Sequence, residues 1–182
     1  NDAWWNRAPQ VRYIRASIYD TADQALNAFD TQSVDIAMTR SINASRYSGS
    51  LNTFSLNART RQLEVLLVNR AYKDFKSDDN GQNLLRQAIA YAINRSELIS
   101  SAYQNMATVA YTPIPSGTWL SNESAIRDIY DPLMAASLLD SAGYKLADDG
   151  NRYKDGKKME KLRILVYDEP GSTARTNAAN KI

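Results

Sequence analysis

The stretch Leu84-Leu85-Arg86-Gln87-Ala88-Ile89-Ala90-Tyr91-Ala92-Ile93-Asn94-Arg95 is the element around which we expect the rest of the chain to be organised. Its apolar residues recur every three or four positions, which places them on one face of a helix. Asp79 or Asn80 can cap the first turn, and Ser96 can cap a second helix that begins where the first one ends. The pattern predicts a buried central helix, and taken alone it indicates packing rather than chemistry.

The composition excludes several classes of protein. The 182 residues carry a net charge of +2, so neither a polyanion-binding excess nor a disordered tail is indicated. Because Cys and His are absent, disulfides, thiolate sites, imidazole bases and the common zinc sites are excluded. The basic run from Lys154 to Lys161 lacks interleaved aromatic residues, so we expect no nucleic-acid partner. An enzymatic activity would have to rest on carboxylates, Lys or Tyr.

Strands are expected to alternate with a single helix before the central stretch. Thr21 and Gln24 have the form of a capping box and predict a helix that begins after Thr21. Strand, helix and strand in this order indicate a parallel crossover unit. The expected strands are residues 11–19, 34–38, 51–56 and 61–69.

The second half of the chain is expected to combine coil, one helix, a hairpin and a strand. Asp131 and Pro132 predict the start of the helix, and Gly143 is placed for a left-handed C-terminal cap. The Asp-Gly pairs at 149–150 and 155–156 predict the turns of a short polar hairpin. The coil, the helix and the final strand correspond to residues 107–119, 132–142 and 162–167.

One sheet is expected to unite the second half of the chain. Residues 61–69 and 161–167 are apolar enough to need cover on their faces, and helices 84–93 and 132–142 each carry an apolar stripe. We therefore predict that these two strands share a sheet under the two helices, in an α/β fold.

Short motifs follow one another in a fixed order along the chain. They are Asn1 to Pro9 with Trp4-Trp5, Val34-Asp35-Ile36, Leu67-Val68-Asn69, Arg86 to Arg95, Pro113-Ile114-Pro115, and Tyr130 through Gly143-Tyr144. In order and spacing the chain resembles the bacterial extracellular solute-binding proteins of family 5, the dipeptide- and oligopeptide-binding proteins of ABC importers. Each motif is short, but together they cover nearly the whole chain.

Three positions depart from the family pattern. Gln32-Ser33 stands where the family usually has Gly-Glu, so that turn is expected to be built differently. Asn94 replaces the usual Asp. Leu67 lies where some oligopeptide binders place a Glu that faces the ligand, which bears on peptide specificity rather than on membership of the family.

The resemblance implies a two-lobed α/β protein that closes on a solute. The expected fold is periplasmic-binding-protein type II-like, present as a partial two-lobed fragment with mixed sheets flanked by helices. Residues 1–60 would end lobe I, and residues 61–182 would form the first part of lobe II, the ligand-binding lobe. Neither end has the features of a natural terminus, so we expect an excised piece of a longer protein. The resemblance further implies a monomer in the periplasm or extracellular space, anchored to the membrane in its full-length form and docking on the membrane permease of an ABC transporter.

In α/β lobes, ligands bind outside the carboxyl ends of the strands. The candidate ligand-binding residues therefore lie at the ends of predicted strands or, for Leu67 and Asn69, on a strand; Tyr103 follows the second helix and matches a position able to reach the cleft. They are Met38, Thr39, Arg40, Leu67, Asn69, Tyr103, Asp168, Glu169 and Thr173. Each polar member has the alternative interpretation of a solvated loop or cap residue. Arg86 and Arg95 are expected to be structural and to bond carbonyls or a carboxylate between helices.

Peptides are the first-choice solute, because backbone hydrogen bonds to an extended peptide need little side-chain specificity. An oligosaccharide or a chelated metal is the alternative within the family, and Trp119 would suit sugar stacking. A hydrolase based on Asp168 and Glu169 is the alternative from another class, although adjacent residues of an extended segment point to opposite faces. We therefore expect a binding protein with no catalytic residues, no cofactor and no metal site.

Overall fold

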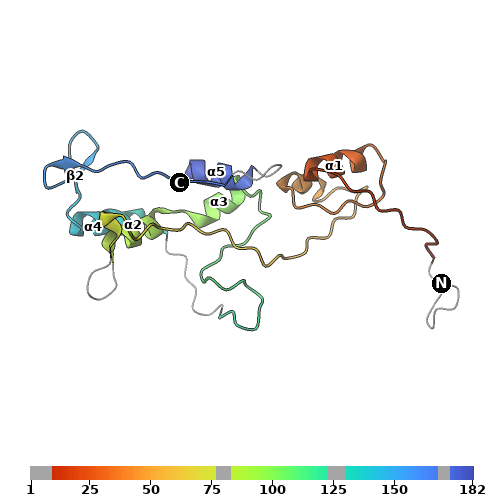
Figure 1. Cartoon of the computed structure of the whole chain (residues 1–182), viewed down its shortest axis with the longest axis horizontal. Helices are drawn as coiled ribbons and strands as arrows, with labels where there is room; N and C mark the ends of the chain where they lie inside the picture. The colour runs from red at the N-terminus through yellow and green to blue at the C-terminus, as the bar shows by residue number, and fades with distance from the viewer. Residues whose placement is uncertain (1–9, 77–82, 123–129, 168–172) are drawn as a thin grey trace.

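The computed structural model describes residues 10–76, 83–122, 130–167 and 173–182. Figure 1 shows an elongated molecule in which short helices are joined by long irregular segments. Its accessible surface is 14998 Å², whereas a compact monomer of 20.4 kDa exposes about 8,800 Å². The chain therefore buries small local cores and leaves several apolar segments exposed.

The first helix, α1 (Ala22–Asp30), begins with the predicted capping box. The Thr21 hydroxyl accepts a hydrogen bond from the Gln24 backbone N–H at 3.2 Å, and the Gln24 side chain accepts one from the Thr21 backbone N–H at 3.1 Å. Two N–H groups that the helix itself cannot pair are thereby satisfied.

The 3-10 helix η1 (Ile42–Tyr47) is tied to α1 through Asp23. The Asp23 carboxylate accepts hydrogen bonds from the Ser41 hydroxyl at 2.8 Å and from the Asn43 side-chain amide at 3.0 Å. These two bonds, first that of Asn43 and then that of Ser41, hold the pKa of Asp23 below its usual value. The 3-10 helix η1 therefore forms one local unit with α1.

The central helix α2 (Leu84–Ala92) packs against α4 (Pro132–Ser141), and this pair carries the main core. Leu85, Ala88 and Ala135 are 3%, 2% and 5% exposed. Alanines on both helices let the two backbones approach closely, which is what the sequence pattern of α2 indicates.

The caps of these helices differ in part from those predicted. Asn83 caps α2 by accepting a hydrogen bond from the Arg86 N–H at 2.8 Å, in place of Asp79 or Asn80. Asn94, rather than Ser96, caps α3 (Arg95–Ser101). Both corrections have one reason: the cap is the residue with extended backbone whose side-chain oxygen reaches the N–H three residues on.

Two further details of the helical region agree with the predictions. Asp131 caps α4 through the Met134 N–H at 2.9 Å, with Pro132 at the first helical position. Arg95 donates to the Ala90 carbonyl at 3.4 Å, which confirms its expected structural role between helices. The short 3-10 helix η2 (Lys73–Phe75) precedes α2 and contacts it.

The C-terminal part contains a small antiparallel sheet and a final helix. Strands β1 (Lys145–Leu146), β2 (Arg152–Lys154) and β3 (Lys157–Lys158) pair in chain order, as the predicted hairpin turns require. Helix α5 (Ala174–Lys181) contacts α3. None of the described helices has the length and hydrophobicity that a membrane span requires.

The larger sheet predicted from the sequence does not form. Within the described residues the sole sheet is the β1–β3 hairpin, so the regular structure there is mostly helical and the mixed sheets expected of an α/β fold are not formed. Strands must exchange backbone hydrogen bonds with a neighbour, and no described segment is paired with the segments that were expected to form strands. Residues 61–69 and 161–167 therefore do not share a sheet. The other expected strands, residues 11–19, 34–38 and 51–56, are likewise irregular.

Two helices end in the same left-handed motif, one with glycine and one without it. At the end of α1, Gln32 has φ +58°, and the N–H of Ser33 donates to the Ala28 carbonyl at 2.9 Å. At the end of α4, Gly143 has φ +91°, and the N–H of Tyr144 closes the same kind of bond. Gln32 is the position where the related family usually has Gly, and the structure shows the left-handed backbone that makes glycine favourable there.

Replacing Gln32 with glycine is therefore expected to raise the free energy of unfolding by about 0.5–1 kcal/mol, measured as the midpoint in urea. Gly143→Ala should lower it by about 1 kcal/mol, because an added Cβ would meet only the Lys154 side chain at 3.5 Å and the cost is that of the backbone. Gln32→Ala is the control and should give no gain. A stabilisation by alanine equal to that by glycine would show that the left-handed conformation is not the cause.

Candidate functional site

Four segments that are distant in sequence meet near the end of α3. The Ser45 hydroxyl of η1 donates to the Gln104 side chain, which lies in the turn after α3. On the other side of this turn, Glu64 of the irregular segment 61–69 binds Arg175 of α5. Figure 1 shows α3 and α5 side by side in the middle of the molecule, next to the part that contains α1 and η1. We call this meeting point the junction: Ser45, Glu64, Tyr103, Gln104 and Arg175.

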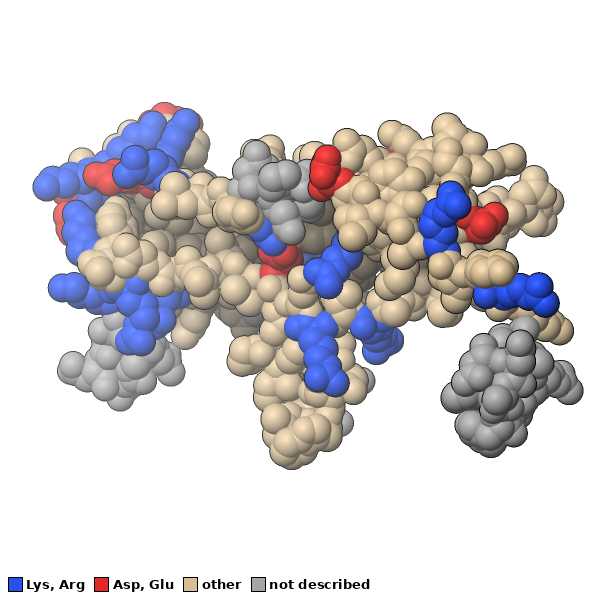
Figure 2. All heavy atoms as spheres, turned by 45° about the vertical axis from the view of Figure 1, so that its right-hand side comes forward, with Lys and Arg blue, Asp and Glu red and all other residues tan. Residues whose placement is uncertain are grey.

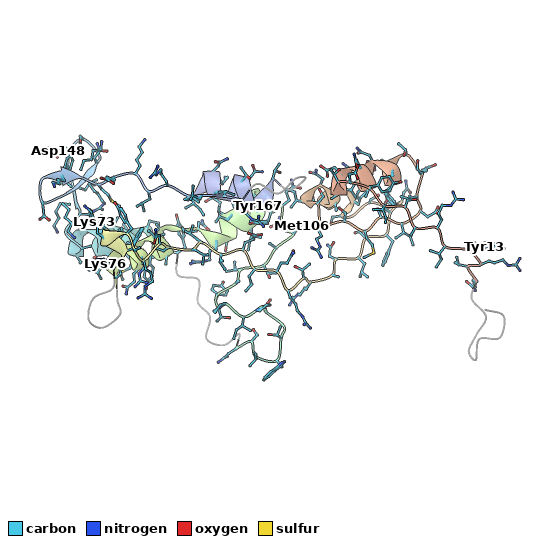
Figure 3. The ribbon with its side chains drawn as sticks, viewed as in Figure 1. Tyr13, Lys73, Lys76, Met106, Asp148 and Tyr167 are labelled. Atoms are coloured by element: carbon cyan, nitrogen blue, oxygen red, sulfur yellow. The ribbon has the colours of Figure 1, made fainter. Side chains whose placement is uncertain are left out.

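The ion pair between Glu64 and Arg175 has two parallel hydrogen bonds. The Arg175 Nε and Nη2 atoms each donate to a different Glu64 carboxylate oxygen at 2.7 Å. Arg175 also donates to the Tyr167 carbonyl at 3.4 Å, and its guanidinium lies 5.9 Å from the centre of the Tyr167 ring. Figure 3 shows Tyr167 beside α5. The guanidinium is thus held in a fixed orientation, which is what recognition of a planar anionic group requires.

Tyr103 is the half-buried phenol of the junction. Burial raises its pKa, the nearby Glu64 raises it further, and Arg175 acts in the opposite direction. The phenol is therefore neutral at neutral pH and can donate a hydrogen bond. The two residues that follow, Gln104 and Asn105, have φ +48° and +61°, and such left-handed residues concentrate at functional sites.

The first three predicted site residues lie on the irregular segment between α1 and η1. Met38 is 93% exposed and Arg40 is also exposed. The Thr39 hydroxyl accepts a hydrogen bond from the Ser41 N–H at 3.0 Å, which is a local turn contact. The structure does not bring these three residues into the junction.

The remaining predicted residues fall on the segments that form the junction, with different exposures. Tyr103 is in it, and Leu67 lies three residues after Glu64 but is 85% exposed. Asn69 closes a local turn by accepting from the Ala71 N–H at 2.9 Å. Thr173 precedes α5 and makes no side-chain cap bond to that helix. Asp168 and Glu169 lie outside the described residues.

Sequence reasoning missed Glu64, Gln104 and Arg175. Glu64 is the single charge between Leu63 and Val65, inside an apolar run, and that interruption was the available signal. Arg175 stands in the first turn of α5, where a cation is unfavourable for the helix dipole and therefore needs a partner elsewhere.

A second feature is an open hollow of about 240 Å³ between α2, α4 and the hairpin. Tyr144 on its wall is 5% exposed, and the Lys154 Nζ lies 5.0 Å from the centre of the Tyr144 ring. Burial, followed by the neighbouring Asp74, raises the pKa of Tyr144 to about 12. These groups satisfy one another, so we interpret the hollow as a packing feature of the core.

The acidic side chains of the described residues do not form a metal-binding cluster. No three acidic residues gather there in a way that could hold a metal ion. The Glu64 carboxylate is already bound through both of its oxygens by Arg175. The junction brings a carboxylate, a guanidinium, a phenol and a side-chain amide close together.

Comparison with protein families decides the assignment. Residues 1–182 match the family described as bacterial extracellular solute-binding proteins, family 5 Middle. The chain belongs to this family. Family 5 proteins are non-enzymatic transport components, so the recognition from the sequence motifs is confirmed and the hydrolase alternative is set aside.

Relatives within family 5 differ in the solute that their names state. The chain is 28% identical to heme-binding protein A of Haemophilus influenzae over 78% of its length, and 26% identical to the dipeptide-binding protein of Escherichia coli over 78%. It is 26% identical to oligopeptide-binding protein OppA of Lactococcus lactis over 99%. These alignments cover 25%, 26% and 30% of the respective relatives, so the chain spans less than a third of their length.

A solved structure supports the family 5 architecture. NikZ from Campylobacter jejuni, crystallised in complex with Ni(L-His), matches with a TM-score of 0.53 and 26% identity. The match covers 76% of this chain and 27% of NikZ.

Proposed function

We propose that this chain is part of the solute-binding component of an ABC-type importer, which captures peptides outside the cytoplasmic membrane and delivers them to the permease. The observation that carries the proposal is the family 5 match over residues 1–182. Relatives named for dipeptides and oligopeptides support the peptide as solute. The junction supports it too, since a guanidinium, a carboxylate and a neutral phenol complement the polar groups of a peptide.

A nickel chelate is the second candidate solute. The NikZ complex and a relative named nickel-binding periplasmic protein favour it. This chain has neither His nor Cys, so its own residues could contact nickel only through oxygen donors or through the other ligands of the ion, as in Ni(L-His). A relative named heme-binding protein A makes heme a further solute to test.

We further propose that residues 1–60 end one lobe and residues 61–182 begin the other. The unit of α1 and η1 is held by its own contacts, among them a salt bridge of 2.5 Å between Arg46 and Asp30. It meets the later part of the chain at the Ser45–Gln104 hydrogen bond. On this proposal the junction lies where the two lobes meet, which is where two-lobed binding proteins hold their ligand.

Native mass spectrometry of the intact protein that carries this chain, after gentle purification, tests the solute directly. A thermal-shift series then compares a synthetic pool of tripeptides, Ni²⁺ mixed with L-His, and heme. Stabilisation by the tripeptide pool alone is the expected result. Stabilisation by Ni²⁺ with L-His alone would replace the peptide by a chelate, and no shift with any of the three would contradict both candidates.

A variant at the junction tests the location of the site. In the intact protein, Arg175→Met should weaken binding of the tripeptide pool at least about tenfold, because a charge-assisted hydrogen bond to the ligand contributes about 1.5–3 kcal/mol. Its stability should fall by less than about 1 kcal/mol, since the pair with Glu64 is partly exposed. Arg12→Met, at an exposed position far from the junction, is the matched control. Equal affinities for the two variants would move the site away from the junction.

A further inference from the structure

One end of the molecule concentrates positive charge. We call it the basic end and define it as residues 73–76 and 140–163, which hold nine Lys and Arg and six Asp and Glu, a net charge of +3. Because the whole chain carries +2, the remainder has a net charge of −1. Figure 2 shows the blue side chains of this end gathered on one part of the surface, and Figure 3 shows Lys73, Lys76 and Asp148 together there.

Three of the six acidic residues of the basic end bind donors of the protein itself. Asp140 binds Arg152 at 2.5 Å, and Asp149 accepts a hydrogen bond from the Tyr153 hydroxyl at 2.9 Å. Glu160 accepts one from the Tyr72 hydroxyl at 3.3 Å. Each of these three carboxylates therefore accepts a hydrogen bond from Arg or Tyr of the protein itself.

The lysines of the hairpin are directed to solvent. Lys145, Lys157, Lys158 and Lys161 are exposed, and within the described residues they form no ion pair. Lys157 and Lys158 make up strand β3, which pairs with β2 on one side and, among the residues that the structure describes, with no strand on the other. Because successive side chains of a strand point to opposite faces, the register places Lys145 and Lys158 on one face of the hairpin and Lys157 on the other. Both faces of the hairpin therefore carry exposed cations.

We propose that the basic end binds the surface of a membrane rich in anionic phospholipid. Lysine is depleted in protein–protein interfaces, which makes a partner protein of fixed shape a poor fit. A nucleic acid is disfavoured because Tyr153 is the one aromatic residue between Lys145 and Lys161. Exposed lysines beside an anionic bilayer gain affinity without a shaped pocket. The inference rests on the proposed function in placing the protein beside a membrane, but not on the identity of the solute.

Sedimentation with lipid vesicles tests the proposal on the intact protein. With any membrane anchor removed, it should bind vesicles that contain phosphatidylcholine and phosphatidylglycerol, and should not bind vesicles of phosphatidylcholine alone. Raising the ionic strength from about 0.1 M to about 1 M should release it, because the Debye length falls from about 10 Å to about 3 Å. The double variant Lys157→Glu/Lys158→Glu should bind at least about 30-fold more weakly, since each lysine near an anionic surface contributes about a fivefold factor.

The matched control is Arg12→Glu/Arg15→Glu, which makes the same charge change at two exposed positions near Tyr13, at the opposite end in Figure 3. It should bind vesicles nearly as well as the unaltered protein. Circular dichroism must show both variants folded, and the tripeptide thermal shift, which reports on the solute, should be unchanged in both. Equal loss in the two variants, or equal binding to neutral vesicles, would overturn the proposal. Binding to poly-L-glutamate without binding to vesicles would also overturn it, and would indicate an acidic protein partner instead.

Discussion

Replacing Leu85 with alanine is expected to lower the free energy of unfolding by about 2–5 kcal/mol. Leu85 is 3% exposed and lies in α2, the helix whose contact with α4 forms the main core. The loss combines the transfer of the removed methyl and methylene groups with the cavity that they leave. Because the chain exposes far more surface than a compact protein of its mass, it has few other buried contacts to compensate.

Urea denaturation followed by circular dichroism measures this loss. Leu56→Ala is the control, because Leu56 is 82% exposed and its truncation should cost less than about 0.5 kcal/mol. If the two leucine variants unfolded at the same urea concentration, the α2–α4 pair could not be the stabilising core of the chain.

Helices could be predicted from the sequence because their signals are local. The Thr21–Gln24 capping box, Asp131 with Pro132, and the four-residue recurrence of α2 each depend on residues within one or two turns. The errors concern single caps. At the start of α3 both Asn94 and Ser96 are residue types that can cap a helix. Asn94 is the cap because its backbone is extended at that point.

The strands could not be predicted in the same way, because a strand depends on a partner. Residues 61–69 have the apolar run of a buried strand, yet Leu67 is 85% exposed and the segment is irregular. The apolar residues of this segment indicate that it could form a buried strand. They do not indicate whether a partner strand is present. The β1–β3 hairpin was predictable because its partners are adjacent in sequence and its turns are marked by Asp-Gly pairs.

In the candidate site, too, the contacts between residues distant in sequence could not be predicted. Tyr103 was anticipated through the resemblance, whereas Glu64 and Arg175 were not. They are separated by 111 positions, and no pattern of spacing joins such residues. Only the packing of α5 beside α3 and segment 61–69 brings the two charges together.

The stability of the chain in alkali should depend on Tyr144. Its ordinary pKa of about 10 is raised to about 12, first by burial and then by the nearby Asp74, so the folded state retains the proton that the unfolded state releases. The contribution of Tyr144 to the free energy of unfolding is fully present below pH 10. As the pH rises from about 10 to about 12, the free energy of unfolding should fall by roughly 2 kcal/mol.

Tyr144→Phe removes the group that titrates while keeping the ring that packs in the core. At pH 7 the variant should be less stable by about 1 kcal/mol, because the hydrogen bond from the Tyr144 hydroxyl to Asp74 is lost. Between pH 10 and 12 its free energy of unfolding should fall less steeply than that of the unaltered chain. The two stability curves should therefore converge or cross, and subtracting them removes the contributions of the other tyrosines and the lysines. Urea midpoints at pH 8, 10, 11 and 12 measure both curves, with all pH values chosen to bracket the shift to about 12. Parallel curves over this range would mean that the proton on Tyr144 is not what couples the fold to alkali.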